Sequence, residues 1–428
     1  MGYDRIPNTR GKTQRRTGSR DKEHVHDTGK KTELLRVSSQ QQVEEVCAEI
    51  RAGGRFGFDT EFVMEDRYEA EVCLIQLASS KRVILVDPFL DLDLGPVWAL
   101  VSDAAIETVV HAGAEDLGQC VQHTGAVPRK VFDVQVAAGL VGMDYPISLQ
   151  KLVRSVLKVH LRKSRTLTDW RKRPLTDAQL RYAVKDVQYL LPLGDELRQR
   201  LERKKRMAWA EEEFRKFESM SLYRRADEEK LLRVKGTGAL DGRQLAIAEA
   251  LLSWREEVAQ KANRPARTVL RDHLLVEIAR HGFQRPEEVR ELRGLNLSRR
   301  HIKELCDVVG KGKALPFKDW PKSDRGGQSE RPEETILVSL ASAVIRDYCL
   351  EHHIAYGLAA NKKSITALVR HYTRGHNSKE PAELLNGWRG QTAGAAVDDV
   401  FRGRRGVHVI TDREKYRLRL VPEHHGGP

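Results

Sequence analysis

Asp59 and Glu61 are two carboxylates separated by one residue inside an apolar run, residues 56–63. Residues two apart on a strand point to the same face of the sheet, so these carboxylates would lie side by side. Acidic residues placed together in an apolar strand reduce stability, and a divalent cation would remove this effect by neutralising both. The segment therefore predicts a metal site, with a solvent-facing acidic pair on an edge strand as the alternative.

Two other segments place acidic residues on expected helices. An apolar run ends at His111, Gly113 follows it, and Asp116 then falls in the first turn of a helix. Tyr182 and Asp186 are four residues apart, so they lie one above the other on one helix face. Each segment alone has an ordinary alternative, because an acid in a first turn complements the helix dipole and a tyrosine can pack in the core.

Together the four carboxylates indicate a site for hard metal ions. Asp59, Glu61, Asp116 and Asp186 would offer oxygen ligands from separate elements, with Tyr182 one turn before the last of them. Such a set suits two Mg²⁺ or Mn²⁺ ions about 4 Å apart. Phosphodiester hydrolysis requires a hydroxide at neutral pH and neutralisation of charge in the transition state. Paired divalent ions supply both without a dedicated protein base.

The constellation resembles the DEDD exonuclease superfamily, and within it the ribonuclease D family, over about residues 35–205. The stretch KSRTLTDWRKRPLTDAQLRYA, residues 163–183, also resembles the pattern that leads into the last motif of that family. The superfamily carries either a tyrosine four residues before the last aspartate or a histidine five before it. Tyr182 fits the first kind, and Arg181 stands at the histidine position, so the tyrosine subtype is predicted.

The resemblance implies a role for each site residue. Asp59, Glu61 and Asp186 would hold the metal that activates the attacking water, and Asp59 would bridge to a second metal. Asp116 would act on that second metal through bound water, and Tyr182 would orient the attacking water. All five residues are present, which argues against an inactive relative.

The resemblance further implies a metal-dependent 3′→5′ exoribonuclease that releases nucleoside 5′-monophosphates. Its expected partner is RNA, with tRNA precursors as the leading substrate. A DNA 3′ exonuclease is one alternative, although the chain has no GxxxxGK[ST] motif of an attached helicase motor. An RNA-binding adaptor with an inert nuclease fold is the other alternative, and the intact site counts against it.

The elements that must position these residues alternate between strands and helices. We expect a strand at 33–37, a helix through 43–50, three closely spaced antiparallel strands and, beyond them, helices near 92–102 and 115–123 separated by a strand at 107–111. The three antiparallel strands are residues 56–63, 72–78 and 83–86. The fold class is therefore α/β, a ribonuclease H-like mixed sheet flanked by helices, followed by two all-α helical-bundle domains.

The second half of the chain is predominantly helical. Residues 246–280 resemble the HRDC domain, chiefly through Trp254 and Arg255, the NRP turn at 263–265 and VLRD at 269–272. We expect one helix over 240–262 and another over 266–281. Residues 354–371 and 384–394 resemble the C-terminal helical domain of ribonuclease D proteins, with a non-binding scaffold as the alternative.

The domain organisation follows from these patterns and from changes in composition. We expect a disordered basic tail (1–31), the exonuclease domain (32–218), an HRDC domain (236–314), a linker (315–333), a second HRDC-like domain (334–405) and a basic tail (406–428).

Overall composition limits the classes of function. The net charge of +13 favours a polyanionic partner, and nucleic acid is the commonest one. Neither a membrane-spanning run nor a secretory signal pattern is evident, so we expect a cytoplasmic protein without a membrane partner. The five cysteines are scattered without a CxxC pair, which predicts neither a zinc site nor a disulfide framework.

Several residues outside the carboxylate set are candidates for nucleic-acid contact. Each has a structural alternative: packing for the glutamine, an internal hydrogen bond for the histidine and simple solvation for the cations. These candidates are Gln76, His111, Lys163, Arg165, Arg173, Arg264, Arg267 and Arg271.

Overall fold

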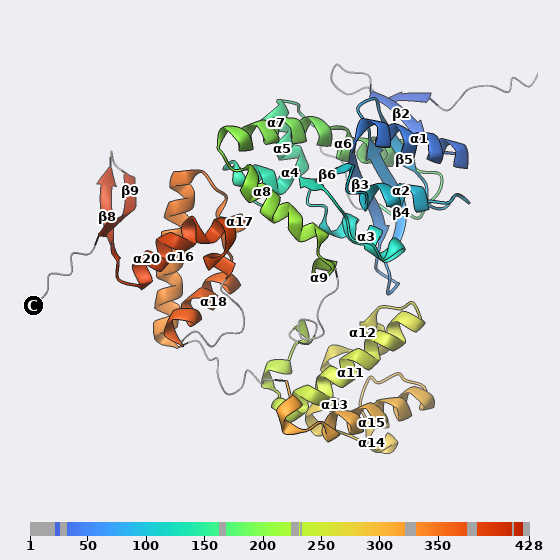
Figure 1. Cartoon of the computed structure of the whole chain (residues 1–428). Helices are drawn as coiled ribbons and strands as arrows, with labels where there is room; N and C mark the ends of the chain where they lie inside the picture. Colours follow the sequence, from blue (N-terminus) through green and yellow to red (C-terminus); the bar gives the residue numbers. More distant parts are fainter. Residues whose placement is uncertain are drawn as a thin grey trace, which may run out of the picture.

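The computed structural model of the chain describes residues 22–25, 32–161, 168–223, 231, 233–321, 331–374, 383–412 and 415–422. Its first part is a mixed sheet flanked by helices, which confirms the predicted fold class (Figure 1). The sheet has seven strands in the order β1-β2-β5-β4-β3-β6-β7. They are β1 (Lys22–Val25), β2 (Thr32–Arg36), β3 (Arg55–Val63), β4 (Glu71–Ala78), β5 (Arg82–Val86), β6 (Glu107–Val110) and β7 (Val131–Asp133).

The central strands β3, β4 and β5 form the predicted antiparallel meander. Strands β2, β6 and β7 join the sheet by parallel pairing, and β1 pairs antiparallel with β2 at one edge. β4 and β5 are covered on both faces, which explains why their sequences are nearly continuous apolar runs rather than alternating ones.

Helices cover both faces of this sheet. They are α1 (Gln40–Gly53), α2 (Gly95–Val101), α3 (Ala114–Thr124), α4 (Val134–Leu140), α5 (Leu149–Leu157), α6 (Asp177–Gln188), α7 (Leu190–Arg203), α8 (Met207–Phe214), η1 (Arg215–Glu218) and α9 (Met220–Tyr223). On one face, Phe58 of β3 contacts Trp98 of α2 with ring centroids 6.2 Å apart. On the other face, α6 packs across β3, β4 and β5, and Leu190 of α7 lies against Gly57.

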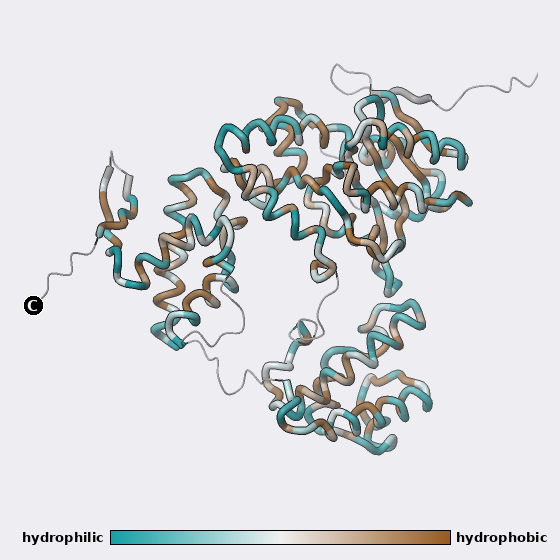
Figure 2. The backbone as a smooth tube through the Cα atoms, in the orientation of Figure 1, coloured by the Kyte–Doolittle hydropathy of each residue, from teal (hydrophilic) through white to brown (hydrophobic). Residues whose placement is uncertain are grey.

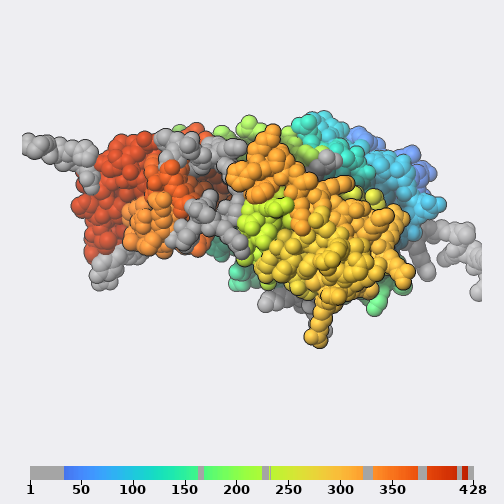
Figure 3. Space-filling model, turned by 90° about the horizontal axis from the view of Figure 1, so that it is seen from below, coloured from blue at the N-terminus to red at the C-terminus, as the bar shows by residue number. Residues whose placement is uncertain are grey.

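A helical module over residues 233–321 has a hydrophobic core of its own. In Figure 3, where the molecule is seen from below, this module lies in front of the nuclease part. Its elements are η2 (Thr237–Ala239), α11 (Gly242–Lys261), α12 (Ala266–Val269), α13 (Asp272–His281), α14 (Pro286–Arg290), α15 (Arg299–Ala314) and η3 (Phe317–Asp319).

The prediction of a single helix over 266–281 was wrong, because the helix is interrupted between α12 and α13. Leu270 is extended there, with φ −145° and ψ 118°. The buried Arg255 side chain donates hydrogen bonds to the Leu270 carbonyl at 3.0 Å and to Asp272 at 2.7 Å. These two bonds stabilise the interruption, because they supply a hydrogen-bond donor to the Leu270 carbonyl and to the Asp272 carboxylate.

A third module over residues 331–422 packs on the nuclease domain and shares one continuous hydrophobic core with it. Its helical elements are α16 (Pro332–His352), α17 (Tyr356–Ala359), α18 (Lys362–Thr373), η5 (Glu383–Leu385), α19 (Gly387–Gly390) and α20 (Ala393–Phe401). Trp388 stacks on Trp209 of α8 with centroids 5.4 Å apart and donates to Glu213 at 2.7 Å. The buried Arg389 guanidinium pairs with the same Glu213 carboxylate. The sequence did not indicate this attachment.

The expected basic tail over 406–428 requires correction. Two antiparallel strands lie there, β8 (Arg405–Asp412) and β9 (Lys415–Pro422), and they pair with each other. Arg417 pairs with Asp347 of α16 at 3.1 Å, and Val407 and Leu420 pack against the shared core. The alternation of Val407, Val409, Leu418 and Leu420 is the strand pattern that the charge of this segment obscured.

Two other predicted irregular segments are partly ordered. Lys22–Val25, within the expected disordered tail 1–31, is strand β1, and the rest of that tail lies outside the described residues. Within the expected linker 315–333, the Trp320 indole donates to the Leu315 carbonyl at 2.8 Å and Trp320 lies against Gly242 of α11. Residues 322–330 lie outside the described residues.

Apolar residues are distributed as expected for packed helical and sheet layers. Figure 2 shows hydrophobic segments within the sheet and on the inner sides of the helices, with hydrophilic segments on the outer turns. Among the described residues, no helix combines the length and apolar character that crossing a membrane would require.

Candidate active site

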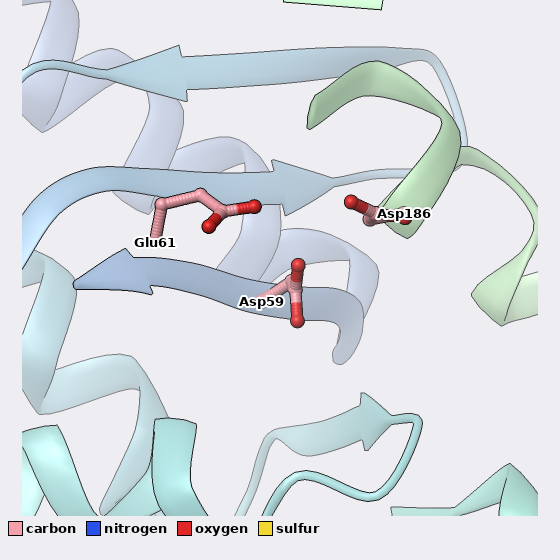
Figure 4. A group of neighbouring side chains, drawn as sticks. All are labelled: Asp59, Glu61 and Asp186. Atoms are coloured by element: carbon pink, nitrogen blue, oxygen red, sulfur yellow. The ribbon is translucent and has the colours of Figure 1, made fainter. Parts of the chain in front are cut away.

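Three carboxylates converge on the sheet face that α6 covers. Asp59 and Glu61 extend from β3 and Asp186 extends from α6, with one oxygen of each lying within 4.8 Å of the others. Figure 4 shows the three side chains pointing toward one another from the strand and the helix. The structure thus brings together three of the four predicted acidic residues.

The alternation of β3 produces half of this arrangement. Phe56 and Phe58 point to the face where α2 packs, and Phe58 is buried with 1% of its surface exposed. Asp59 and Glu61 take the intervening positions and point to the opposite face. The pairing register of β3 with β4 shifts between Glu61 and Phe62. This bulge interrupts the regular ladder next to the acidic pair, and the pairing resumes at Phe62 and Val63.

Helix α6 supplies the other half. A capping box fixes its start, because Thr176 accepts from the Gln179 amide and the Gln179 side chain accepts from the Thr176 amide. Tyr182 and Asp186 then share one face, and the Tyr182 hydroxyl lies near enough to the Asp186 carboxylate to lower its pKa. Trp170, only 5% exposed, holds the Tyr182 ring from the side at a centroid distance of 6.0 Å.

Asp116 is held beside this cluster by a residue that the sequence did not single out. Its carboxylate accepts from the Thr60 amide at 3.0 Å and from the Thr60 hydroxyl at 2.6 Å. Thr60 stands between Asp59 and Glu61, so the strand that carries two of the acids also anchors a third. Asp116 lies outside the group of three with converging oxygens, although its negative charge acts on all of them.

The electrostatics of the site oppose ionisation in the absence of a cation. Burial, reinforced by the charges of Asp116, Asp186 and Glu61, raises the pKa of Asp59 well above its ordinary value. Burial and the charges of Asp186 and Asp116 raise the pKa of Glu61 to about 8. Burial and the charge of Asp116 raise the pKa of Asp186 to about 7, against a lowering by the Tyr182 hydrogen bond.

These residues fit a divalent cation. The Asp186 Oδ2 atom is buried and has no hydrogen-bond partner in the structure. Buried, mutually repelling carboxylates with free oxygen atoms are the ligand set that Mg²⁺ and Mn²⁺ prefer. A bound cation would reverse the pKa shifts, because it stabilises the ionised form of every carboxylate around it.

Two candidates for nucleotide contact are occupied within the protein or buried by it. Gln76 of β4 is completely buried, with 0% of its surface exposed. His111 bonds the Ile147 carbonyl through Nε2 at 2.8 Å. Burial lowers the pKa of His111, although the neighbouring Asp133 opposes this effect. Nucleotide contact by either residue stays a prediction.

The basic run before α6 contributes a structural clamp. Arg173 pairs with Asp87 and donates to the carbonyl oxygens of Cys73 and Trp170, each at 2.7 Å. This network holds the loop that carries Trp170 against the sheet. Phosphate contact by Arg173 stays a prediction, while Lys163 and Arg165 lie outside the described residues.

The helical module 233–321 touches the nuclease domain close to the catalytic strand. The backbone amides of Tyr68 and Glu69, in the loop after β3, donate to Asn263 Oδ1 at 3.2 and 3.4 Å. The Tyr68 hydroxyl donates to Glu256 of α11 at 2.9 Å. The three candidate arginines on this module are all exposed and follow that contact directly along the chain; they are Arg264, Arg267 and Arg271.

Comparisons with known proteins agree with this geometry. Residues 35–202 match the family model described as 3'-5' exonuclease, and residues 244–309 match the HRDC domain. Ribonuclease D of Acidiphilium cryptum is 31% identical over 395 residues, covering 91% of this chain and 97% of that protein. Ribonuclease D of Pseudomonas paraeruginosa is 32% identical over 371 residues, covering 85% and 96%.

The chain belongs to the ribonuclease D family. The predicted resemblance is therefore confirmed, and the chain is a 3′→5′ exoribonuclease that depends on divalent metal. Among solved structures it is similar to Escherichia coli RNase D, with a TM-score of 0.75 and 28% identity over 86% of this chain and 98% of that one. That protein is described as an exoribonuclease involved in structured RNA processing.

Proposed function

We propose that this ribonuclease D family member trims the 3′ ends of structured RNA in the cytoplasm, with tRNA precursors as substrates, and releases nucleoside 5′-monophosphates. The convergence of Asp59, Glu61 and Asp186 within 4.8 Å carries the proposal, together with Tyr182 on the same helix face as Asp186. The similarity to a protein involved in structured RNA processing supports the choice of substrate.

Two divalent ions, Mg²⁺ or Mn²⁺, would be held by this site. Asp59, Glu61 and Asp186 would bind one ion, and Asp59 and Asp116 would contribute to the other. When bound, the ions supply a nucleophile at neutral pH and neutralise charge on the leaving 3′ oxygen. The Tyr182 hydroxyl would orient the attacking water, because Tyr182 lies one turn before Asp186 on the same helix and its ring packs against Trp170.

The exposed arginines of the helical module would hold the RNA backbone. Arg264, Arg267 and Arg271 lie on the module that contacts the loop after β3, so an RNA strand entering the site could reach them. Contacts of this kind recognise phosphates without reading the sequence.

The test follows a 3′-extended tRNA precursor with chelator, Mg²⁺ or Mn²⁺, and separates products by length and by nucleotide chromatography. We expect stepwise shortening and nucleoside 5′-monophosphates only with metal. Asp186→Asn should abolish shortening, whereas Asp177→Asn should retain it, because Asp177 is an exposed residue on the same helix outside the site.

The same assay separates the alternatives. Faster shortening of single-stranded DNA of equal length would identify a DNA exonuclease. Tight RNA binding without shortening in either metal would identify an RNA-binding adaptor and refute the proposed hydrolysis.

A further inference from the structure

Gln76 is a buried polar residue that the packing of the protein does not explain. Its surface is 0% exposed, and neither its Nε2 nor its Oε1 atom has a hydrogen-bond partner in the structure. A buried amide without a partner destabilises a fold, and an apolar side chain of the same length would not. Gln76 therefore lowers the stability of the fold, and no hydrogen bond within the described residues compensates for this.

The pairing register places Gln76 beside the catalytic carboxylates. Gln76 of β4 stands directly opposite Asp59 of β3, and Leu85 of β5 stands on its other side. Directly opposed residues point to the same face with Cβ atoms about 5 Å apart, which is within reach of a glutamine side chain. Asp59 is thus the polar neighbour of Gln76 in this row of the sheet.

The opposite side of the amide is closed by α6. This helix packs across β3, β4 and β5 and presents an apolar stripe to the sheet. The buried residues of that stripe include Leu180, Ala183, Val184 and Val187. These side chains offer no hydrogen-bonding group, and the buried Gln179 side chain is already bonded to Thr176 and to the Asp169 carbonyl. The acceptors left for the amide N–H of Gln76 are the clustered carboxylates, and Asp59 is the one that stands directly opposite it.

We propose that Gln76 is a positioning residue whose Nε2 donates a hydrogen bond to the Asp59 carboxylate when divalent metal occupies the site. This inference rests on the proposed binding of metal by Asp59. A carboxylate that holds a metal is ionised, and its remaining oxygen lone pairs accept hydrogen bonds. Partners of this kind fix the orientation of a ligand, and their removal costs about 10–100-fold in metal affinity or activity.

Gln76→Met tests the proposal because methionine keeps the length of the side chain and removes the amide. The full-length protein is stripped with chelator, and Mn²⁺ affinity is measured by calorimetry and by the electron paramagnetic resonance signal of free Mn²⁺. We expect a higher Tm without metal, a Mn²⁺ affinity lower by ~10-fold or more, a lower kcat and an unchanged KM for RNA. A higher Tm together with a lower Mn²⁺ affinity distinguishes a positioning role of Gln76 from a packing role.

Thr108→Val is the matched control. Thr108 is also completely buried with an unpaired Oγ1, but it stands opposite Phe56, on the sheet face away from the carboxylates. We expect this variant to raise the Tm in the same way and to leave Mn²⁺ affinity unchanged. Gln76→Leu serves as a second apolar variant in case methionine perturbs the packing.

The outcomes are decided by Mn²⁺ affinity and Tm together. An affinity within about twofold of wild type in either Gln76 variant would overturn the proposal, and so would a fall in both affinity and Tm, which indicates damaged packing. Asp59→Asn separates this result from the parent proposal. If the wild type and Gln76→Met bind Mn²⁺ equally well and Asp59→Asn does not bind it, only the role of Gln76 is refuted. If the wild type itself binds no Mn²⁺, the metal site is refuted.

Discussion

The raised pKa of Glu61 predicts that the metal-free protein becomes less stable as the pH rises. The unfolded chain releases the Glu61 proton near pH 4.5, whereas the folded chain retains it until about pH 8. Between these values the folded state binds more protons, so the free energy of unfolding decreases with increasing pH. This loss of stability is absent below the pKa of Glu61 in the unfolded chain and complete above its pKa in the folded chain.

The size of this effect follows from the difference between the two pKa values. One unit corresponds to about 1.4 kcal/mol, so the shift of Glu61 from 4.5 to about 8 amounts to roughly 5 kcal/mol across the window. This is a large part of the roughly 5–15 kcal/mol that stabilises a typical domain. Divalent metal should restore stability at high pH, by about 2.7 kcal/mol at a concentration of 100 times Kd.

The assay is urea unfolding of the wild type and of Glu61→Gln between pH 5 and pH 9, each with chelator or with Mg²⁺. Glutamine has the same shape as glutamate and no charge, so the variant should lose most of the pH dependence. In chelator it should be more stable than the wild type at pH 8.5 and similar to it at pH 5. In Mg²⁺ the difference at pH 8.5 should become smaller, because the wild type gains stability from the bound ion and the variant has lost a metal ligand.

The reasoning would be refuted by one specific result. If the difference in stability between wild type and Glu61→Gln in chelator is the same at pH 5 and at pH 8.5, Glu61 is not held protonated by its surroundings. The argument for a cation at the cluster would then lose its electrostatic basis.

Three other predictions concern the catalytic tyrosine, the third module and the RNA contacts. Tyr182→Phe should lower kcat and move the acidic limb of the pH–rate profile upward, because the Tyr182 hydrogen bond lowers the pKa of Asp186. Arg389→Met should lower the free energy of unfolding by about 3–5 kcal/mol, because it removes the buried guanidinium that pairs with the buried Glu213 carboxylate. The exposed Lys261→Met should cost less than about 1 kcal/mol, and equal losses in urea unfolding would contradict this. Replacing Arg264, Arg267 and Arg271 by Gln should reduce the slope of log affinity against log salt for single-stranded RNA by about 2. Replacing two arginines elsewhere on the module, Arg285 and Arg300, is the control, because each pairs with a glutamate three or four residues further along the chain. Equal slopes for the two sets would exclude phosphate contact by the first.

The sequence alone was sufficient to predict the elements that carry the catalytic residues. The meander β3–β4–β5 and the helix with Tyr182 and Asp186 follow from local patterns: short turns between apolar runs, alternation along β3 and an apolar stripe with a four-residue spacing. These patterns are legible because each depends on residues close together in the chain. Two predictions failed. The many charged residues of 405–422 obscured the alternation in β8 and β9. The interruption between α12 and α13 depends on Arg255, which lies on another helix and therefore outside the local pattern.

The tertiary structure decided what lies around those residues. Thr60 anchors Asp116 across 56 residues of sequence, and Gln76 becomes an unpaired amide because α6 closes over β4. Arg389 joins the third module to Glu213 across 176 residues. The sequence determined which side chains could bind metal, because residue type and local spacing are properties of the sequence itself. Which groups hold them in place was settled only by folding, because those partners are selected by packing between segments far apart in the chain.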